Sequence, residues 1–207
     1  MDPRWKHPFT CIVAGPTSSG KTHFVARLVR HADEMIHPAP ERILWYYGEW
    51  QRTYFDLQKY NNVSFAEGIP KEQDINPRLR NLVIMDDLLA ETDNRVTKLF
   101  TKGSHHRNTS VIYISQNIFD KNKENRTISL NAHYMVLFKS PRDAMQVEHL
   151  ARQMYPGKTK FMREAFKDAT SEPFSYLLID LRPETPDELR LRSSIFPNES
   201  HTVYVQR

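Results

Sequence analysis

The chain has 207 residues, a formal net charge of +4, 39% hydrophobic and 26% charged residues, and a single cysteine, Cys11. These values are ordinary for a one-domain globular protein with a real core, and one cysteine excludes an internal disulfide or a cysteine-rich zinc site. No run approaches the roughly 18 apolar residues of a membrane span, and residues 1–7 lack the apolar stretch of a signal peptide. We therefore expect an intracellular protein that is neither secreted nor membrane-bound.

Segments that read as strands and helices alternate along the chain, which predicts an α/β fold around a mostly parallel sheet. Strands are expected at residues 9–14, 42–47, 63–68, 81–87, 110–116, 134–139 and 174–181. Helices are expected at residues 20–31, 50–60 and 92–102, then from a cap at Ser140, and again up to residue 167. The polar residues 120–126 predict a basic loop, and the tail predicts one helical turn near residues 187–191. We thus expect one domain at 1–182, with a tail at 183–207 that packs on it.

The first predicted strand runs into "GPTSSGKT" (Gly15–Thr22), which matches the phosphate-loop pattern G-x-x-x-x-G-K-[ST] in full. The glycines of this pattern let the backbone wrap a phosphate with its N–H groups pointing inward, and the following helix adds its dipole. Lys21 is expected to reach the β- and γ-phosphates, and Thr22 to offer its hydroxyl to Mg²⁺. The predicted nucleotide-binding residues are Gly15, Pro16, Thr17, Ser18, Ser19, Gly20, Lys21, Thr22 and His23.

A buried strand, "LVIMDD", ends in two acids, Asp86 and Asp87. A phosphate loop needs a carboxylate for its metal, and the end of a buried strand is where a Walker B acid lies. We expect Asp86 to hold Mg²⁺ together with Thr22, and Asp87 to orient or deprotonate the attacking water. The alternative is that the two acids simply open a turn.

The next strand along the chain ends at Gln116. If this strand lies beside the first one, the amide faces the γ-phosphate, where it can sense the nucleotide state or position water. The alternative is a role as the cap of a helix or loop.

Other motifs narrow the class of phosphate-loop protein. A GTPase is disfavoured because "NKEN" (122–125) lacks the Asp of the base-reading N-K-x-D motif, and "DLLA" (87–90) stands in place of D-x-x-G. Small-molecule kinases pair the Walker B strand directly with the phosphate-loop strand. Here we expect the strand that ends at Gln116 to lie between them, as in the catalytic-acid ATPases, which include RecA-like, AAA+ and FtsK–HerA motors.

Four segments carry a resemblance to a known family: "GPTSSGKT", "LVIMDD", "HHRNTSVIYISQ" and "LNAHYMVLFKSPRD". Together they resemble the FtsK–HerA superfamily, and most of all the compact genome-packaging ATPases of poxviruses, other large DNA viruses and Polinton/Maverick-type elements. The resemblance covers residues 8–155. It implies a P-loop NTPase domain, a three-layer α/β/α sandwich with the mostly parallel sheet of the ASCE (RecA/FtsK-like) type.

The resemblance also implies roles for single residues. Arg107 stands where the family has an arginine that is offered across a subunit interface to the neighbour's nucleotide, and Arg126 and Arg142 are weaker candidates. Such an arginine balances charge in the transition state. The alternative is a surface or phosphate-contacting role for Arg107. The second Walker B acid is often Glu in the family, whereas this chain has the shorter Asp87.

Positive charge is concentrated in residues 95–167, which hold 14 Lys and Arg against 5 Asp and Glu. Such a segment suits a polyanion, although solvated helix faces give the same pattern. Together with the resemblance, it leads us to expect an ATP- and Mg²⁺-dependent double-stranded DNA translocase that packages a viral genome as a homo-oligomeric ring. Its partners are double-stranded DNA, bound without sequence reading, and a capsid protein, in the host cytoplasm or nucleus. A non-translocating ATP-dependent switch or assembly factor and a P-loop nucleoside or polynucleotide kinase remain alternatives.

Overall fold

The computed structural model describes residues 2–86, 88, 94–103, 108–117, 123–142 and 144–206, with the backbone alone at 94, 102, 103 and 123–125. Its core is a nine-stranded sheet in the order β11-β10-β9-β8-β2-β7-β6-β4-β5. In chain order the strands are β2 (Thr10–Ala14), β4 (Arg42–Tyr47), β5 (Val63–Glu67), β6 (Asn81–Asp86), β7 (Thr109–Ser115), β8 (Tyr134–Phe138), β9 (Tyr176–Asp180), β10 (Leu191–Ser193) and β11 (Thr202–Tyr204). A short parallel pair, β1 (Trp5–Lys6) and β3 (Ile36–His37), lies apart from this sheet.

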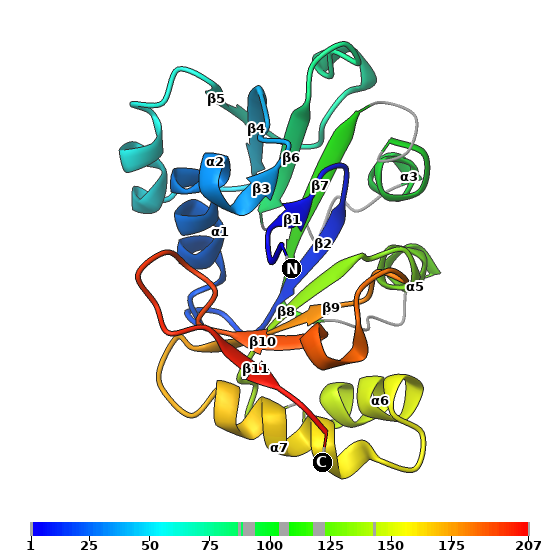
Figure 1. Cartoon of the computed structure of the whole chain (residues 1–207). Coiled ribbons are helices and arrows are strands. Elements are labelled where there is room, and N and C mark those ends of the chain that lie inside the picture. Colours follow the sequence, from blue (N-terminus) through cyan, green and yellow to red (C-terminus); the bar gives the residue numbers. More distant parts are fainter. Residues whose placement is uncertain are drawn as a thin grey trace.

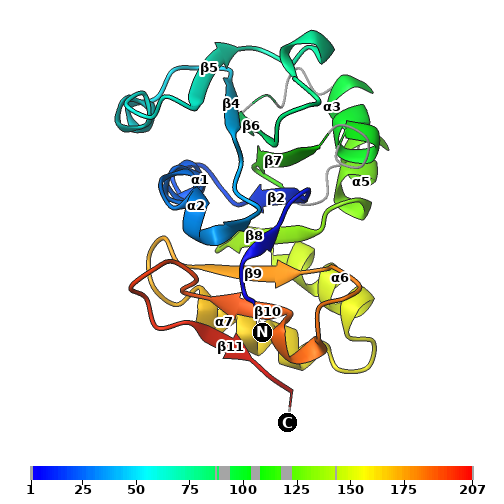
Figure 2. The same ribbon diagram turned by 45° about the horizontal axis from the view of Figure 1, so that its top comes forward.

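The six neighbouring strands β8, β2, β7, β6, β4 and β5 are all parallel, so their carboxyl ends meet at one edge of the sheet. Helices cover both faces of the sheet, as Figures 1 and 2 show. Because both faces are covered, strands such as β2, β6 and β7 are buried at every residue and read as continuous apolar runs. The predicted α/β class and the mostly parallel sheet are confirmed.

Each face of the sheet has its own set of helices. One face carries α1 (Lys21–Arg30), α2 (Ala32–Met35) and the 3₁₀ helix η1 (Arg52–Leu57). The other carries α3 (Asn94–Lys98) with its π-helical continuation η4 (Leu99–Gly103), α5 (Lys123–Leu130), α6 (Ala144–Met154) and α7 (Thr159–Ala169). Two further 3₁₀ turns are η2 (Glu72–Asp74) and η5 (Asp187–Leu189). None of the described helices has the length and apolarity to cross a membrane.

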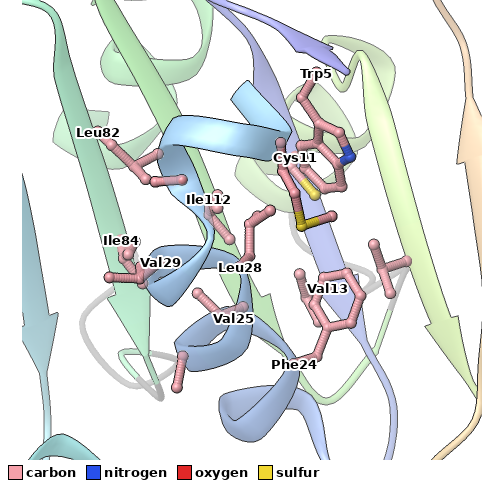
Figure 3. Close-up of a cluster of buried hydrophobic side chains, with 14 of the residues drawn as sticks. Trp5, Cys11, Val13, Phe24, Val25, Leu28, Val29, Leu82, Ile84 and Ile112 are labelled. Atoms are coloured by element: carbon pink, nitrogen blue, oxygen red, sulfur yellow. The ribbon is translucent and has the colours of Figure 1, made fainter. Parts of the chain in front are cut away.

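Helix α1 is fixed against the sheet by one apolar side. Figure 3 shows Phe24, Val25, Leu28 and Val29 directed at strand residues such as Ile112. Val25 and Leu28 are fully buried, and each burial of this kind stabilises the fold by about 1.5–3 kcal/mol. Because α1 cannot shift along the sheet, its first residues are held at the carboxyl end of β2. Cys11, predicted to be a core residue, is buried in the same cluster.

Several elements begin or end at other residues than the sequence predicts. The helix expected at 50–60 is reduced to the 3₁₀ helix η1, and the helix expected from Ser140 begins at Ala144 after a turn at Pro141. Proline favours a turn as well as the start of a helix, so the sequence alone does not separate the two. The predicted basic loop is wrong for residues 123–126, which begin α5. Arg126 is exposed there, and α5 meets the core further on, at Ile128.

The sequence prediction missed two strands in the tail. Strand β10 pairs antiparallel with β9, and β11 pairs antiparallel with β10, so the sheet continues past the parallel part. Each has three residues, too few for a periodic pattern, and a charge interrupts the first. That charge, Arg192, is buried against Asp180 with Nη2 3.1 Å from Oδ2, and it also donates to the carbonyl oxygen of Pro3 at 2.9 Å. The pair therefore joins the tail, β9 and the N-terminal segment.

Replacing Arg192 by methionine should strongly destabilise the fold. The variant leaves Asp180 as an uncompensated charge, with its side chain 7% exposed, and breaking a buried pair in this way costs about 3–5 kcal/mol. Urea unfolding should show a large fall in the midpoint. The control is Lys160→Met, which breaks the exposed pair with Glu164 and should cost no more than about 1 kcal/mol. Equal midpoints for the two variants would contradict this reading of the tail.

Candidate nucleotide-binding site

Residues 15–20 form a tight loop between β2 and α1, and Lys21 and Thr22 are the first two residues of α1. Gly20 has φ 104°, a left-handed conformation that favours glycine. Gly15 is required for another reason, since a Cβ there would lie 2.6 Å from Cβ of Phe138. Ser19 Oγ is buried without a hydrogen-bond partner among the described residues. The loop thus has the close backbone approach and the unmatched polar atom expected of a phosphate cradle.

Lys21 folds back over this loop. Its ammonium donates hydrogen bonds to the carbonyl oxygens of Gly15 and Pro16, at 2.7 and 2.8 Å. The first residues of α1 lie beside it, so a helix N-terminus and a cation face the same space. This arrangement favours an anion at the loop, and a phosphate would offer Lys21 stronger, charge-assisted hydrogen bonds.

Asp86 is 2% exposed, and its carboxylate lies against Thr22. Its Oδ2 accepts hydrogen bonds from Thr22 Oγ1 at 3.0 Å and from the Tyr54 hydroxyl at 2.8 Å. Tyr54 comes from η1 and is fully buried. Sequence reasoning missed it, because nothing in one sequence indicates that this aromatic segment crosses the end of β6.

These groups line a cavity of about 540 Å³ at the carboxyl edge of the parallel strands. It is bounded by Thr17, Ser18, Ser19, Gly20, Lys21, Thr22, His23, Glu49, Trp50, Gln51, Thr53, Asp86, Ile114, Ser115, Gln116 and Phe174. The predicted residues 17–23, Asp86 and Gln116 thus come together. Gln116 follows β7 directly and is exposed. The lining residues at 49, 50, 51 and 53 and Phe174 were not predicted, since they come from loops or the start of η1, whose positions depend on the whole sheet.

The structure does not place the other charged candidates in the cavity. Asp87 and Arg107 fall outside the described residues, so their roles stay predictions. Arg126 and Arg142, the weaker arginine-finger candidates, are exposed, and neither lines the cavity. Strand β7 lies between β2 and β6, so the predicted position of the strand before Gln116 is confirmed.

The donor set fits a magnesium ion. Thr22 and Asp86 present a hydroxyl and a carboxylate that already meet, and Mg²⁺ prefers oxygen ligands. In proteins Mg²⁺ is commonly bound by one or two such groups plus water and substrate phosphates. Among the residues that the structure describes, no cluster of three or more His, Cys, Asp or Glu could hold a metal by itself. A metal at Thr22 and Asp86 would therefore depend on the nucleotide for its remaining ligands.

The fold matches solved structures of ATPases at low sequence identity. The genome packaging NTPase B204 from Sulfolobus turreted icosahedral virus 2, solved with ATP-gammaS, matches with a TM-score of 0.54 and 10% identity, over 99% of this chain and 98% of that one. The cytoplasmic domain of the Thermomonospora curvata Type VII secretion ATPase EccC matches with a TM-score of 0.55 and 13% identity, over 86% of this chain and 24% of that one. No family model and no curated protein matches the sequence. The predicted resemblance to packaging ATPases is thus confirmed for the fold.

Tyr54→Phe should weaken metal-dependent nucleotide binding. The ring still fills its place, but the Asp86 carboxylate loses the hydrogen bond from the Tyr54 hydroxyl that accompanies the one from Thr22. Since a hydrogen bond to a charged group contributes about 1.5–3 kcal/mol, the Kd for ATPγS with Mg²⁺ should rise about tenfold or more.

Calorimetric titration with and without EDTA measures this effect. Tyr60→Phe is the matched control, because Tyr60 belongs to the same segment and its hydroxyl has no bond to Asp86. If both variants bind Mg·ATPγS as the wild type does, Tyr54 does not position the carboxylate.

Proposed function

We propose that this chain is an ATP-hydrolysing enzyme of the ASCE division and the FtsK–HerA type, which moves double-stranded DNA during viral genome packaging. The observation that carries the proposal is the position of β7 between β2 and β6. It puts Gln116 in one cavity with Lys21, Thr22 and Asp86. The shared fold with a genome packaging NTPase supports the same assignment.

Each group in the cavity has a chemical task in this proposal. The loop N–H groups and Lys21 bind the β- and γ-phosphates and stabilise the negative charge that develops during transfer. Thr22 and Asp86 would hold Mg²⁺, which supplies further charge neutralisation at those phosphates. Gln116 reaches the γ-phosphate end and orients water or reports whether the γ-phosphate is present. The strand order also favours hydrolysis over a small-molecule kinase, in which the Walker B strand pairs with the phosphate-loop strand.

The exposed basic residues indicate where DNA would bind. Lys98 on α3 and Arg126 on α5 are exposed, and these two helices lie side by side on one face (Figure 1). On α6 and α7, by contrast, Arg152 and Arg163 both pair with Glu148, which offsets part of their charge. We therefore assign phosphate contacts to the α3–α5 face, with no sequence reading.

Assembly completes the proposed site. A neighbouring subunit would supply Arg107 to the nucleotide, which implies a homo-oligomeric ring and a weakly active isolated subunit. A capsid protein as the docking partner and a location in the host cell follow from the packaging role, and they are part of the proposal.

Lys21→Ala should abolish ATP hydrolysis. The substitution removes the cation at the phosphate loop, and loss of such a group lowers kcat by about 100-fold or more. In the wild type, double-stranded DNA should raise the rate of phosphate release, and added salt should reduce that stimulation.

Release of inorganic phosphate measures both effects, with Lys160→Ala as the control for loss of an exposed lysine. Wild-type protein at high concentration that releases no phosphate, with or without DNA, would exclude the motor. Phosphate transfer to a nucleoside would indicate a kinase, and hydrolysis without displacement along DNA would indicate a switch.

A further inference from the structure

A second carboxylate lies at the cavity beside Asp86. Tyr47, the last residue of β4, is the Cα partner of Asp86, and the N–H of Gly48 donates to the Asp86 carbonyl oxygen at 3.3 Å. The next residue, Glu49, therefore leaves the sheet directly next to the end of β6. Glu49 lines the same cavity as Lys21 and Asp86.

The two carboxylates have different surroundings. Asp86 is almost fully buried, and one of its oxygens already accepts two hydrogen bonds, so its direction is fixed, which suits a metal ligand. Glu49 is exposed and makes no hydrogen bond or ion pair with another described residue. A general base needs a carboxylate that can meet a water molecule and take its proton. Among the described acids that line the cavity, Glu49 has that freedom.

We infer that Glu49 is the general base of the hydrolysis, an assignment that rests on the proposed ATPase function. The oxygen of a water molecule forms a bond to the γ-phosphorus. The bond between that phosphorus and the β–γ bridging oxygen breaks, and its electron pair stays on ADP. The water proton passes to the Glu49 carboxylate and from there to the released phosphate or to solvent. Asp87, the acid that the sequence favours for this step, then has another role.

Glu49→Gln tests the assignment. The amide keeps the size of the side chain but cannot accept the proton, so kcat should fall about 100-fold or more. The Kd for Mg·ATPγS should stay within about twofold of the wild type, because binding depends on the loop, Thr22 and Asp86. After mixing with ATP, the variant should hold unhydrolysed ATP, which quench and chromatography detect.

The matched control is Glu67→Gln. Glu67 ends β5, pairs in register with Tyr47, is exposed, and does not line the cavity, so its loss should leave the rate unchanged. If Glu49→Gln hydrolyses ATP at the wild-type rate while Asp87→Asn does not, the base is Asp87 and the inference is wrong. If the wild type itself releases no phosphate, the proposed function fails instead.

A different feature of the same cavity concerns the base of the nucleotide. Phe174 is 70% exposed and has φ 64°, which is costly for a bulky side chain. Its Cβ and Cδ1 would lie 3.3 Å from a Cβ placed on Gly20, so the side chain stands against the phosphate loop. An exposed aromatic side chain in a strained conformation, at the edge of a cavity, indicates a ligand contact.

The sheet order shows which end of a nucleotide Phe174 would meet. Asp86 and Glu49 lie on the β6 and β4 side of the phosphate loop, where the γ-phosphate and its metal belong. Phe174 precedes β9, on the opposite side of the loop. We infer that the Phe174 ring stacks on the nucleobase, again given that the cavity binds ATP.

Phe174→Gly separates this role from a structural one. Glycine adopts φ 64° without strain, so the urea midpoint should stay the same or rise, while the Kd for ATPγS should increase about tenfold through loss of the stacked ring. The Kd for tripolyphosphate should not change, since that ligand has no base. Phe174→Tyr should keep wild-type affinity. Equal weakening of both ligands, or of neither, would overturn the inference, and a wild type that binds neither ligand would contradict the proposed function.

Discussion

The carboxylate of Asp86 is the point on which the site depends. Thr22 from the start of α1 and Tyr54 from η1 both donate to the same oxygen, and the carboxylate itself ends β6. Three segments far apart in the sequence are thus held at one buried charge. Such a charge is costly to bury unless it is well hydrogen-bonded, so the surrounding fold has to keep both donors in place. The hydrogen bonds to Asp86 therefore hold the phosphate loop in place before a nucleotide binds.

The sheet order explains why those segments meet. Six parallel strands bring their carboxyl ends to one edge, and the apolar side of α1 packs across β2, β7 and β6 (Figure 3). A shift of α1 by one turn would carry Thr22 about 5.4 Å away from Asp86 and expose Val25 or Leu28. The packing of α1 in the core therefore also fixes the geometry of the site. The antiparallel extension through β9, β10 and β11 stabilises the opposite end of the sheet.

Much of this could be predicted from the sequence, because the parallel strands are continuous apolar runs and the phosphate loop has a rigid spacing. The junction between β2 and α1 and the acid at the end of β6 follow from those local patterns. Tyr54, Glu49 and Phe174 could not be predicted, because each comes from a loop or short 3₁₀ segment placed by pairings between distant strands. The tail strands β10 and β11 were not predicted for a related reason, since three residues are too few to show the alternating pattern of a strand.

The environments of the two cavity acids assign them different chemistry. Hydrogen bonds from Thr22 and Tyr54 hold the Asp86 carboxylate in one direction, which suits a metal ligand better than a group that must move to take a proton from water. An exposed carboxylate on the adjacent strand end is less well placed to hold a metal, yet it can approach water and return the proton to solvent. In the proposed mechanism, this separation of tasks lets the metal ligand Asp86 stay rigid while Glu49 takes up and releases the proton. Glu49, which follows the neighbouring strand β4, also has a side chain one methylene longer than that of Asp87.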